Sequence, residues 1–218
     1  MSLAGTGAIA IWNDVKEGKR DLITDWHDRD HIPERTGIPG FLRGRRFAAL
    51  EGSPEFFILY ETADGSAAQS PAYFARLNNP SPWTAKANKD FLGTIRGICD
   101  VAASLGHGEG GCMLTLRADP AETEAASVDA AVIAALPAIV AEHGVLAAHW
   151  LVAQRAVSLI ETNERVGRAP LRAPNRILMI EGIAPDSIKA ALAKHLPALA
   201  GDVGVYRLEV ARAAGHRD

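Results

Sequence analysis

The segment Trp26–Glu34, with the sequence WHDRDHIPE, concentrates side chains that can move a proton. On a helix that turns about 100° per residue, Trp26, His27, Asp30 and His31 share one broad face. A histidine titrates near neutral pH, and a neighbouring carboxylate can fix its tautomer. We therefore predict that His27 and His31 are catalytic and that Asp30 orients an imidazole. The structural alternative is a histidine that is hydrogen-bonded in the core or at a subunit interface.

Metal binding is a narrower interpretation of the same segment, because histidines four residues apart can hold zinc or iron. The run from His27 to His31 departs from the H-E-x-x-H pattern, since Asp28 replaces the glutamate and points away on a helix. No third ligand follows at a recognisable spacing. Cys99 and Cys112 fit neither a metal spacing nor a disulfide framework. We expect no metal and two buried thiols.

Other side chains are candidates for binding a substrate. Trp12 and Asn13 end a predicted strand, Trp26 lies on the histidine-bearing face, and Trp83 follows a break between two prolines. Core packing explains the tryptophans equally well. Arg46 is a candidate for an anionic substrate group, although a solvated or ion-paired arginine is the simpler interpretation.

Two glycine-rich stretches, Gly5–Ala10 and Gly106–Gly111, match dinucleotide-binding patterns in spacing alone. A pyrophosphate site needs a strand before the glycines and a helix after them. Each of these stretches leads into a predicted strand instead. We therefore expect no nucleotide and no organic cofactor.

The predicted elements occur in the order βαββαβ twice, with Pro33 expected to end or kink the first helix. In the first half the strands are expected at 7–13, 40–50, 55–62 and 98–105, and the helices at 16–30 and at 71–91, the latter broken by two prolines. In the second half the strands are expected at 111–117, 144–156, 176–182 and 203–211, and the helices at 127–143 and 187–199.

A shift of 104 residues superimposes Pro33 on Pro137 and Gly40 on Gly144, and a shift of 120 aligns residues 57–61 with 177–181. We therefore predict two ferredoxin-like repeats, residues 1–107 with the pocket and residues 108–218 degenerate. The extra 16 residues fall at 158–173. We interpret them as a solvated surface loop that contains a Glu161–Arg165 pair. A lid and a dimer arm are the alternatives.

The second repeat serves as an internal control for the polar cluster. The shift places alanines opposite Trp26, His27, Asp30, His31 and Glu34, so that the second helix is expected to pack through alanines alone. The fold would then not require the polar cluster. Glu61 and Glu181 occur in both repeats, which favours a structural role such as pairing with a strand arginine.

The predicted strands are apolar on both faces, with Phe57 and Leu59 alternating with Ile58 and Tyr60. Burial on both sides requires helices over one face and another layer over the opposite face. We predict an α+β fold in which two antiparallel sheets pack as a barrel-like core. Along one strand, Arg43 and Arg45 should point to the face opposite that of Arg46.

The composition is that of an ordinary globular chain. The net charge of −3 argues against a general nucleic-acid binder. The longest apolar run, residues 130–141, is short for a membrane span and contains Pro137. No secretory signal pattern opens the chain. We expect a cytoplasmic protein with a small-molecule ligand, no nucleic-acid or membrane partner, and a homodimer left open.

The pattern Trp26-His27-x-x-x-His31-Ile32-Pro33-Glu34, followed by Ile38–Phe41, resembles the EthD-like branch of the dimeric α/β-barrel superfamily over about the first sixty residues. The resemblance implies paired ferredoxin-like sheets. It also implies functions such as cofactor-independent oxygenation, polyketide cyclisation or haem chemistry. We predict an enzyme or accessory protein for an apolar, aromatic or polyketide-like compound. A non-catalytic binder, a structural dimer and a haem enzyme are the alternatives.

Overall fold

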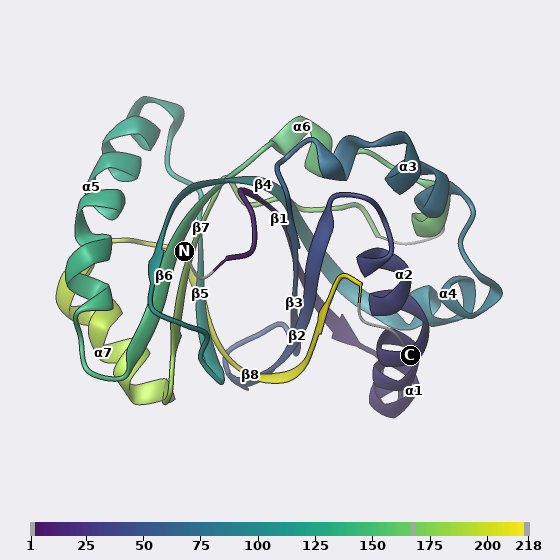
Figure 1. Ribbon diagram of the computed structural model, residues 1–218, viewed down its shortest axis with the longest axis horizontal. Coiled ribbons are helices and arrows are strands. Elements are labelled where there is room, and N and C mark those ends of the chain that lie inside the picture. Colours follow the sequence, from purple (N-terminus) through teal and green to yellow (C-terminus); the bar gives the residue numbers. More distant parts are fainter. Residues whose placement is uncertain (1–2, 167–168, 216–218) are drawn as a thin grey trace.

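A computed structural model describes residues 3–166 and 169–215, whose strands close into a barrel with helices on two opposite sides (Figure 1). The strands are β1 Gly7–Val15, β2 Phe41–Glu51, β3 Phe56–Thr62, β4 Phe91–Gly106, β5 Cys112–Ala118, β6 Val145–Ala153, β7 Arg176–Gly182 and β8 Asp202–Ala213. The α-helices are α1 Arg20–Trp26, α2 Ile32–Thr36, α3 Pro71–Asn78, α4 Pro82–Ala87, α5 Glu122–Val140, α6 Arg155–Ser158 and α7 Pro185–His195.

The strands are antiparallel neighbours in the closed order β1-β3-β2-β8-β5-β7-β6-β4. The first half contributes the order β4-β1-β3-β2 and the second half the same arrangement, β8-β5-β7-β6. The pairs β2–β8 and β4–β6 join the halves. The predicted α+β fold with a barrel-type core is confirmed. The division into two repeats at residue 107 stays a prediction.

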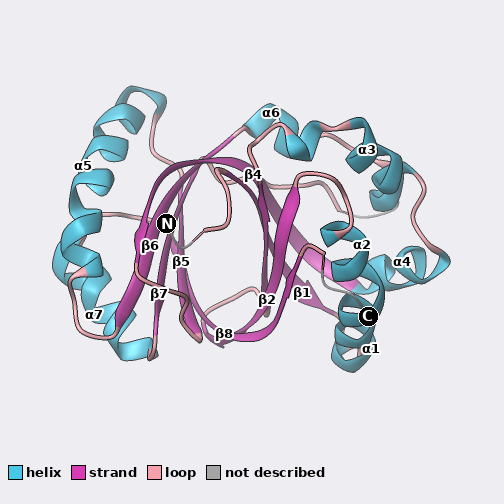
Figure 2. Cartoon of the chain, in the orientation of Figure 1, coloured by secondary structure: helices cyan, strands magenta, loops and turns pink. Residues whose placement is uncertain are grey.

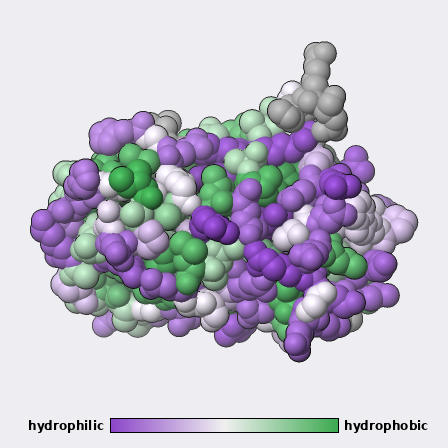
Figure 3. Space-filling view, turned by 90° about the horizontal axis from the view of Figure 1, so that it is seen from below, coloured by the Kyte–Doolittle hydropathy of each residue, from purple (hydrophilic) through white to green (hydrophobic). Residues whose placement is uncertain are grey.

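The strands are apolar on both faces because one face lines the barrel and the other supports helices. The barrel interior holds large side chains such as Trp12, Phe47, Phe57 and Tyr206, all fully buried. Helices α1 to α4 cover the outer face of the first half, and α5 and α7 that of the second (Figure 2). Figure 3 shows that apolar side chains on the face it presents form separate small groups among polar ones.

Pro33 does not end the first helix, so the first of the two predicted alternatives, an end or a kink, is wrong. Helical backbone runs from Arg20 to Thr36, with a π-helical turn at His27–His31 in which the Ile32 N–H bonds to the His27 carbonyl. In an α-helix the proline ring clashes with the carbonyl four residues earlier. The wider π turn makes room for Pro33. The predicted break in the second helical region is confirmed by the gap between α3 and α4.

The π turn also corrects the comparison of the two halves. The inner face of α5 buries Val132, Leu136 and Ile139, whereas Ala131 is exposed. The prediction that this helix packs through alanines alone is therefore wrong. The π turn adds one residue to the first helix. Before the turn, the alignment of the two helices therefore shifts by one residue, and His27 corresponds to Val132 rather than to Ala131. The second half still packs this position with an apolar side chain.

Two elements begin well before their predicted starts. Strand β4 begins at Phe91 because its first part pairs with β1 and its last part with β6. Helix α5 begins at Glu122, and it is the one helix among the described residues that is long and apolar enough to cross a membrane by length and composition. Core helices of soluble proteins meet the same criterion. Here its inner face packs against β6 and α7.

Candidate functional site

A small cavity lined by both polar and apolar side chains lies between the outer face of the first-half sheet and its helices. We call it the inner pocket; its volume is about 70 Å³. Side chains from β1, β3, β4, the π turn and the segment around Arg165 line it, among them Asn13, Tyr60, Arg96, His27 and His31. A larger cleft of about 520 Å³, here called the outer cleft, shares the lining residues Asn88, Phe91, Thr94 and Glu164 with it. The two cavities therefore adjoin along these four residues.

His27 is fully buried and has a partner on each ring nitrogen. Nδ1 lies 3.3 Å from Nη1 of Arg46, and Nε2 lies 3.1 Å from the hydroxyl of Tyr60. A guanidinium can only donate, so Nδ1 accepts and the proton of the neutral ring resides on Nε2. Burial, and then the charges of Arg46 and Arg35, hold the pKa of His27 well below its usual range. The imidazole is therefore neutral and donates to Tyr60.

Arg46 holds the imidazole rather than a substrate, which contradicts its predicted binding role. Its guanidinium pairs with Asp28 at 2.5 Å and with Glu209 at 3.0 Å, and it donates to the Thr24 carbonyl. It is not among the described residues that line the inner pocket. As expected from strand alternation, Arg46 lies on the helix side of β2 while Arg45 points into the barrel. The simpler interpretation of Arg46 as an ion-paired arginine is confirmed.

Tyr60 is the residue at the inner pocket that sequence reasoning did not single out. It lies on β3 opposite Ile9, on the same sheet face as Ile58. Its oxygen accepts from His27, and burial raises its pKa. No other described residue is a hydrogen-bond partner of this hydroxyl, so its own proton is available to the cavity. The alternation Phe56, Ile58, Tyr60 was visible in the sequence, but not its nearness to His27.

His31 shares the pocket wall with His27, as predicted. The two ring centres are 5.6 Å apart, and the His31 ring packs on Trp26 with a centre-to-centre distance of 4.4 Å. The predicted binding residue Trp26 therefore lines the pocket and supports His31, while its indole N–H donates to Thr84 at 3.1 Å. The π turn places both imidazoles on the cavity side of the helix.

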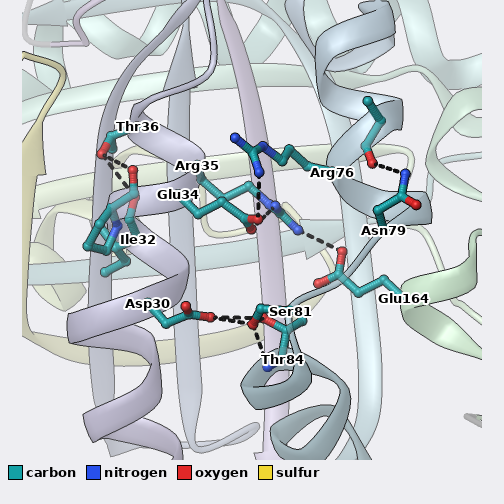
Figure 4. Close-up of polar contacts among 12 residues, drawn as sticks. Asp30, Ile32, Glu34, Arg35, Thr36, Arg76, Asn79, Ser81, Thr84 and Glu164 are labelled. Atoms are coloured by element: carbon teal, nitrogen blue, oxygen red, sulfur yellow. Dashed lines mark hydrogen bonds and ion pairs between the residues drawn. The ribbon is translucent and has the colours of Figure 1, made fainter.

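Asp30 does not orient an imidazole through the contacts of its carboxylate. Its Oδ2 accepts hydrogen bonds from Ser81 at 2.9 Å and from Thr84 at 3.1 Å, where α4 begins (Figure 4). Ser81 also caps α4 by accepting from the Thr84 N–H. The carboxylate thus ties the π turn to α4, and the orienting role predicted for it belongs to Arg46.

The remaining predicted binding residues separate into two groups. Asn13 lines the inner pocket and accepts from Thr94 at 2.6 Å. Trp12 points to the opposite face of β1, into the barrel, where its indole N–H donates to Thr115 at 3.1 Å. Trp83 packs on the cluster around Ile23 and lines neither cavity. For both tryptophans, packing is the explanation that fits.

The segment predicted as a solvated loop, residues 158–173, instead covers the pocket of the first half; its residues 167 and 168 lie outside the described residues. We call this segment the insertion. Arg35, 3% exposed, donates to Glu34 and to Glu164 of the insertion, each at 2.6 Å (Figure 4). The Asn88 side chain donates to the Glu164 carbonyl at 3.0 Å. The predicted Glu161–Arg165 pair is present at 3.8 Å. The solvated-loop prediction is therefore wrong.

Glu61 and Glu181 are structural, as their recurrence indicated. Both are fully buried inside the barrel, and both contact Arg45, Glu61 at 3.0 Å and Glu181 at 2.9 Å. Burial alone would raise the pKa of Glu181, but hydrogen bonds from His149 and Arg45 lower it to about 2. These charges link β2 of the first half to β7 of the second.

The inner pocket does not fit a haem group. Haem requires an axial ligand facing a slot as wide as the macrocycle, and this cavity measures about 70 Å³. His27 uses both ring nitrogens on Arg46 and Tyr60. The outer cleft is larger, yet no described residue that lines it is a histidine, cysteine, methionine or tyrosine. For metal ions, residues 3–166 and 169–215 contain no cluster of three or more histidine, cysteine or acidic side chains.

Comparisons with solved structures agree with the fold. An anthrone oxidase-like protein has a TM-score of 0.66 at 12% identity, with 99% of this chain and 97% of that chain covered. A candidate monooxygenase from Fusobacterium nucleatum subsp. nucleatum has a TM-score of 0.61 at 12% identity, covering 99% and 98%. A haem-binding protein from Thermus thermophilus has a TM-score of 0.53 at 10% identity, covering 94% and 92%.

Neither a family model nor a curated protein matches the sequence. At these identities the structural likeness establishes the fold alone. The chain is an α+β protein with a dimeric α/β-barrel type of core.

Proposed function

We propose that the chain is a small-molecule enzyme that moves a proton on a planar, enolisable compound of aromatic or polyketide type, without an organic cofactor. His31 takes a proton from a C–H or O–H group of the ligand. Tyr60 donates a hydrogen bond to the carbonyl oxygen on which negative charge develops, and His31 returns the proton to a different atom. The observation that carries the proposal is the chain of contacts from Arg46 through His27 to Tyr60.

That chain of contacts supports a donor role for Tyr60. Since His27 gives its one proton to the phenol oxygen, the phenol's own hydrogen is free to face the cavity. A preorganised donor aimed at a developing oxyanion is among the largest contributions to catalysis. His27 is then a positioning residue, which revises the catalytic role predicted from the sequence. The raised pKa of Tyr60 keeps the phenol protonated at neutral pH.

Exchange of the methylene hydrogens of anthrone for deuterium, followed by NMR under nitrogen, tests this function. We expect the protein to accelerate exchange and Tyr60→Phe to slow it by about 100-fold, the typical loss of one oxyanion donor. His31→Gln should reduce exchange to the buffer rate. Tyr206→Phe, which removes a buried hydroxyl inside the barrel and outside the pocket, is the matched control and should exchange like the unaltered protein.

Three outcomes decide between this proposal and its alternatives. Binding of anthrone without faster exchange would replace the enzyme with a non-catalytic binder. Exchange that Tyr60→Phe leaves unchanged would remove the donor role. A change of oligomeric state in the His31→Gln protein, with ligand affinity preserved, would favour a structural dimer.

Three finer assignments rest on the sequence and are part of the proposal. The EthD-like affiliation is supported by the histidine pattern at residues 26–34, which lies at the pocket. The tandem repeat is supported by the equal strand order of the two halves. A cytoplasmic location is supported by an ordinary composition and two cysteines that are both free and buried.

A further inference from the structure

The wall that the insertion contributes to the inner pocket carries two buried polar groups without a hydrogen-bond partner among the described residues. They are Nε of Arg165 and the hydroxyl of Thr162, whose residues are 6% and 8% exposed. The carboxylate oxygen of Glu161 that pairs with Arg165 is 3.8 Å from Nε, beyond hydrogen-bond distance. The Glu161 side chain is 64% exposed to water. A buried donor without a partner costs stability, so a bound group that supplies one is expected.

Arg96 adds a second positive charge to this wall. It donates to the carbonyls of Ser158 and Ile160, at 2.8 to 3.1 Å, and it forms no ion pair with any described residue. Burial, and next the charge of Arg96, lower the pKa of Arg165, although Glu161 and Glu164 act in the opposite direction. The two guanidiniums therefore repel each other inside a cavity that both of them line.

The third arginine of the pocket is already neutralised. Arg35 pairs with Glu34 and Glu164 at 2.6 Å each, so Glu164 is occupied by a short contact on that side (Figure 4). Within one cavity, the Arg35 guanidinium therefore pairs with two carboxylates. Arg96 and Arg165 together have one, the distant and exposed carboxylate of Glu161. Positive charge without a matching anion is therefore confined to the insertion side of the pocket.

We propose that Arg96, Thr162 and Arg165 form an anion-binding subsite, and that the ligand of the inner pocket carries a carboxylate or another oxyanion. Guanidinium and hydroxyl groups all donate, and an oxyanion accepts several such bonds at once. This inference rests on the proposed function, because it adds an acidic group to the ligand whose carbonyl meets Tyr60. The insertion would then select acidic ligands over neutral ones.

The test compares a matched pair of probes, 2-naphthoate and 2-naphthamide, by isothermal titration calorimetry. We expect the acid to bind about 10- to 100-fold more tightly, as charged hydrogen bonds typically provide. Arg165→Met should weaken binding of the acid far more than binding of the amide and so remove this preference. Thr162→Val, which preserves shape, should reduce the preference severalfold even if Arg165→Met fails to fold. Arg155→Met, an exposed arginine of the neighbouring helix α6, should retain it.

A second measurement separates the subsite from the aromatic ligand. Inorganic phosphate, at ionic strength matched with chloride, should raise the thermal midpoint of the unaltered protein and of Arg155→Met but not of Arg165→Met. Phosphate protection without binding of either naphthyl probe would leave the subsite standing and overturn the aromatic function. Equal binding of acid and amide, or protection that persists in Arg165→Met, would overturn the subsite.

Discussion

The buried neutral imidazole of His27 should make folding stability depend on pH in a way that one substitution removes. In the unfolded chain a histidine titrates near 6.5, whereas burial and two guanidiniums hold the pKa of His27 well below that value in the folded protein. Below pH 6.5 the unfolded state therefore binds one more proton than the folded state. Stability from this residue is present above pH 6.5 and is lost as the pH falls.

The magnitude follows from one proton. Since the pKa of folded His27 lies well below 6.5, its protonation in the unfolded chain costs at most about 0.1 kcal/mol of folding stability at pH 7.5 and at most about 1.4 kcal/mol at pH 5.5. His27→Gln removes the titration, and an amide can still accept from Arg46 and donate to Tyr60. The difference in unfolding free energy between the two proteins should therefore shrink between these pH values, by up to about 1.3 kcal/mol.

Urea unfolding at pH 7.5, 6.5 and 5.5 measures this difference, because the contributions of the other histidines cancel between the two proteins. His107→Gln, at an exposed histidine in the segment between β4 and β5, is the control and should run parallel to the unaltered protein. Parallel curves for His27→Gln as well would show that His27 titrates in the folded protein as it does in the unfolded chain. The assigned tautomer, and with it the donor role of Tyr60, would then be refuted.

Three further predictions test the barrel, the insertion and the cavity. Glu181→Gln leaves Arg45 with one buried carboxylate, so we expect the free energy of unfolding, measured in urea at pH 7, to fall by about 3 kcal/mol. A decrease below about 1 kcal/mol would contradict the pairing. Arg35→Met releases Glu164, and amide hydrogen exchange should therefore accelerate in residues 160–166 while β7 keeps its protection. Titration with haem should leave the Soret band as broad as that of free haem and at the same wavelength, because the pocket that offers imidazoles is far smaller than a porphyrin.

The fold could be predicted from the sequence where local signals repeat. Glycine and proline mark the turns, and two-sided apolar strands require covering layers on both faces, which a barrel with outer helices provides. The π turn was not predicted, because its i to i−5 bonding has no period that a helical pattern reveals. The early start of β4 at Phe91 was also missed, since its first residues are partly exposed and show no clean alternation.

The site could be located from the sequence but not assembled. The histidines and Trp26 lie on one helical segment, so their spacing was enough to place them together. Tyr60, Arg96 and Arg165 reach the same cavity from β3, β4 and the insertion, which lie far apart in the chain. The periodicity of the sequence contains no information on which distant segments come into contact. A buried arginine whose Nε has no hydrogen-bond partner among the described residues became visible only when the insertion was found packed over the pocket.

The difference between Asp30 and Arg46 shows how one partner determines what an imidazole can do. A carboxylate would accept from His27 and leave the other nitrogen as a base facing the cavity. A guanidinium donates instead, so the proton must reside on the nitrogen that faces Tyr60. The same histidine therefore becomes a donor rather than an acceptor. In the proposed reaction, proton abstraction is therefore assigned to the second imidazole of the cavity, His31, whose ring is packed on Trp26.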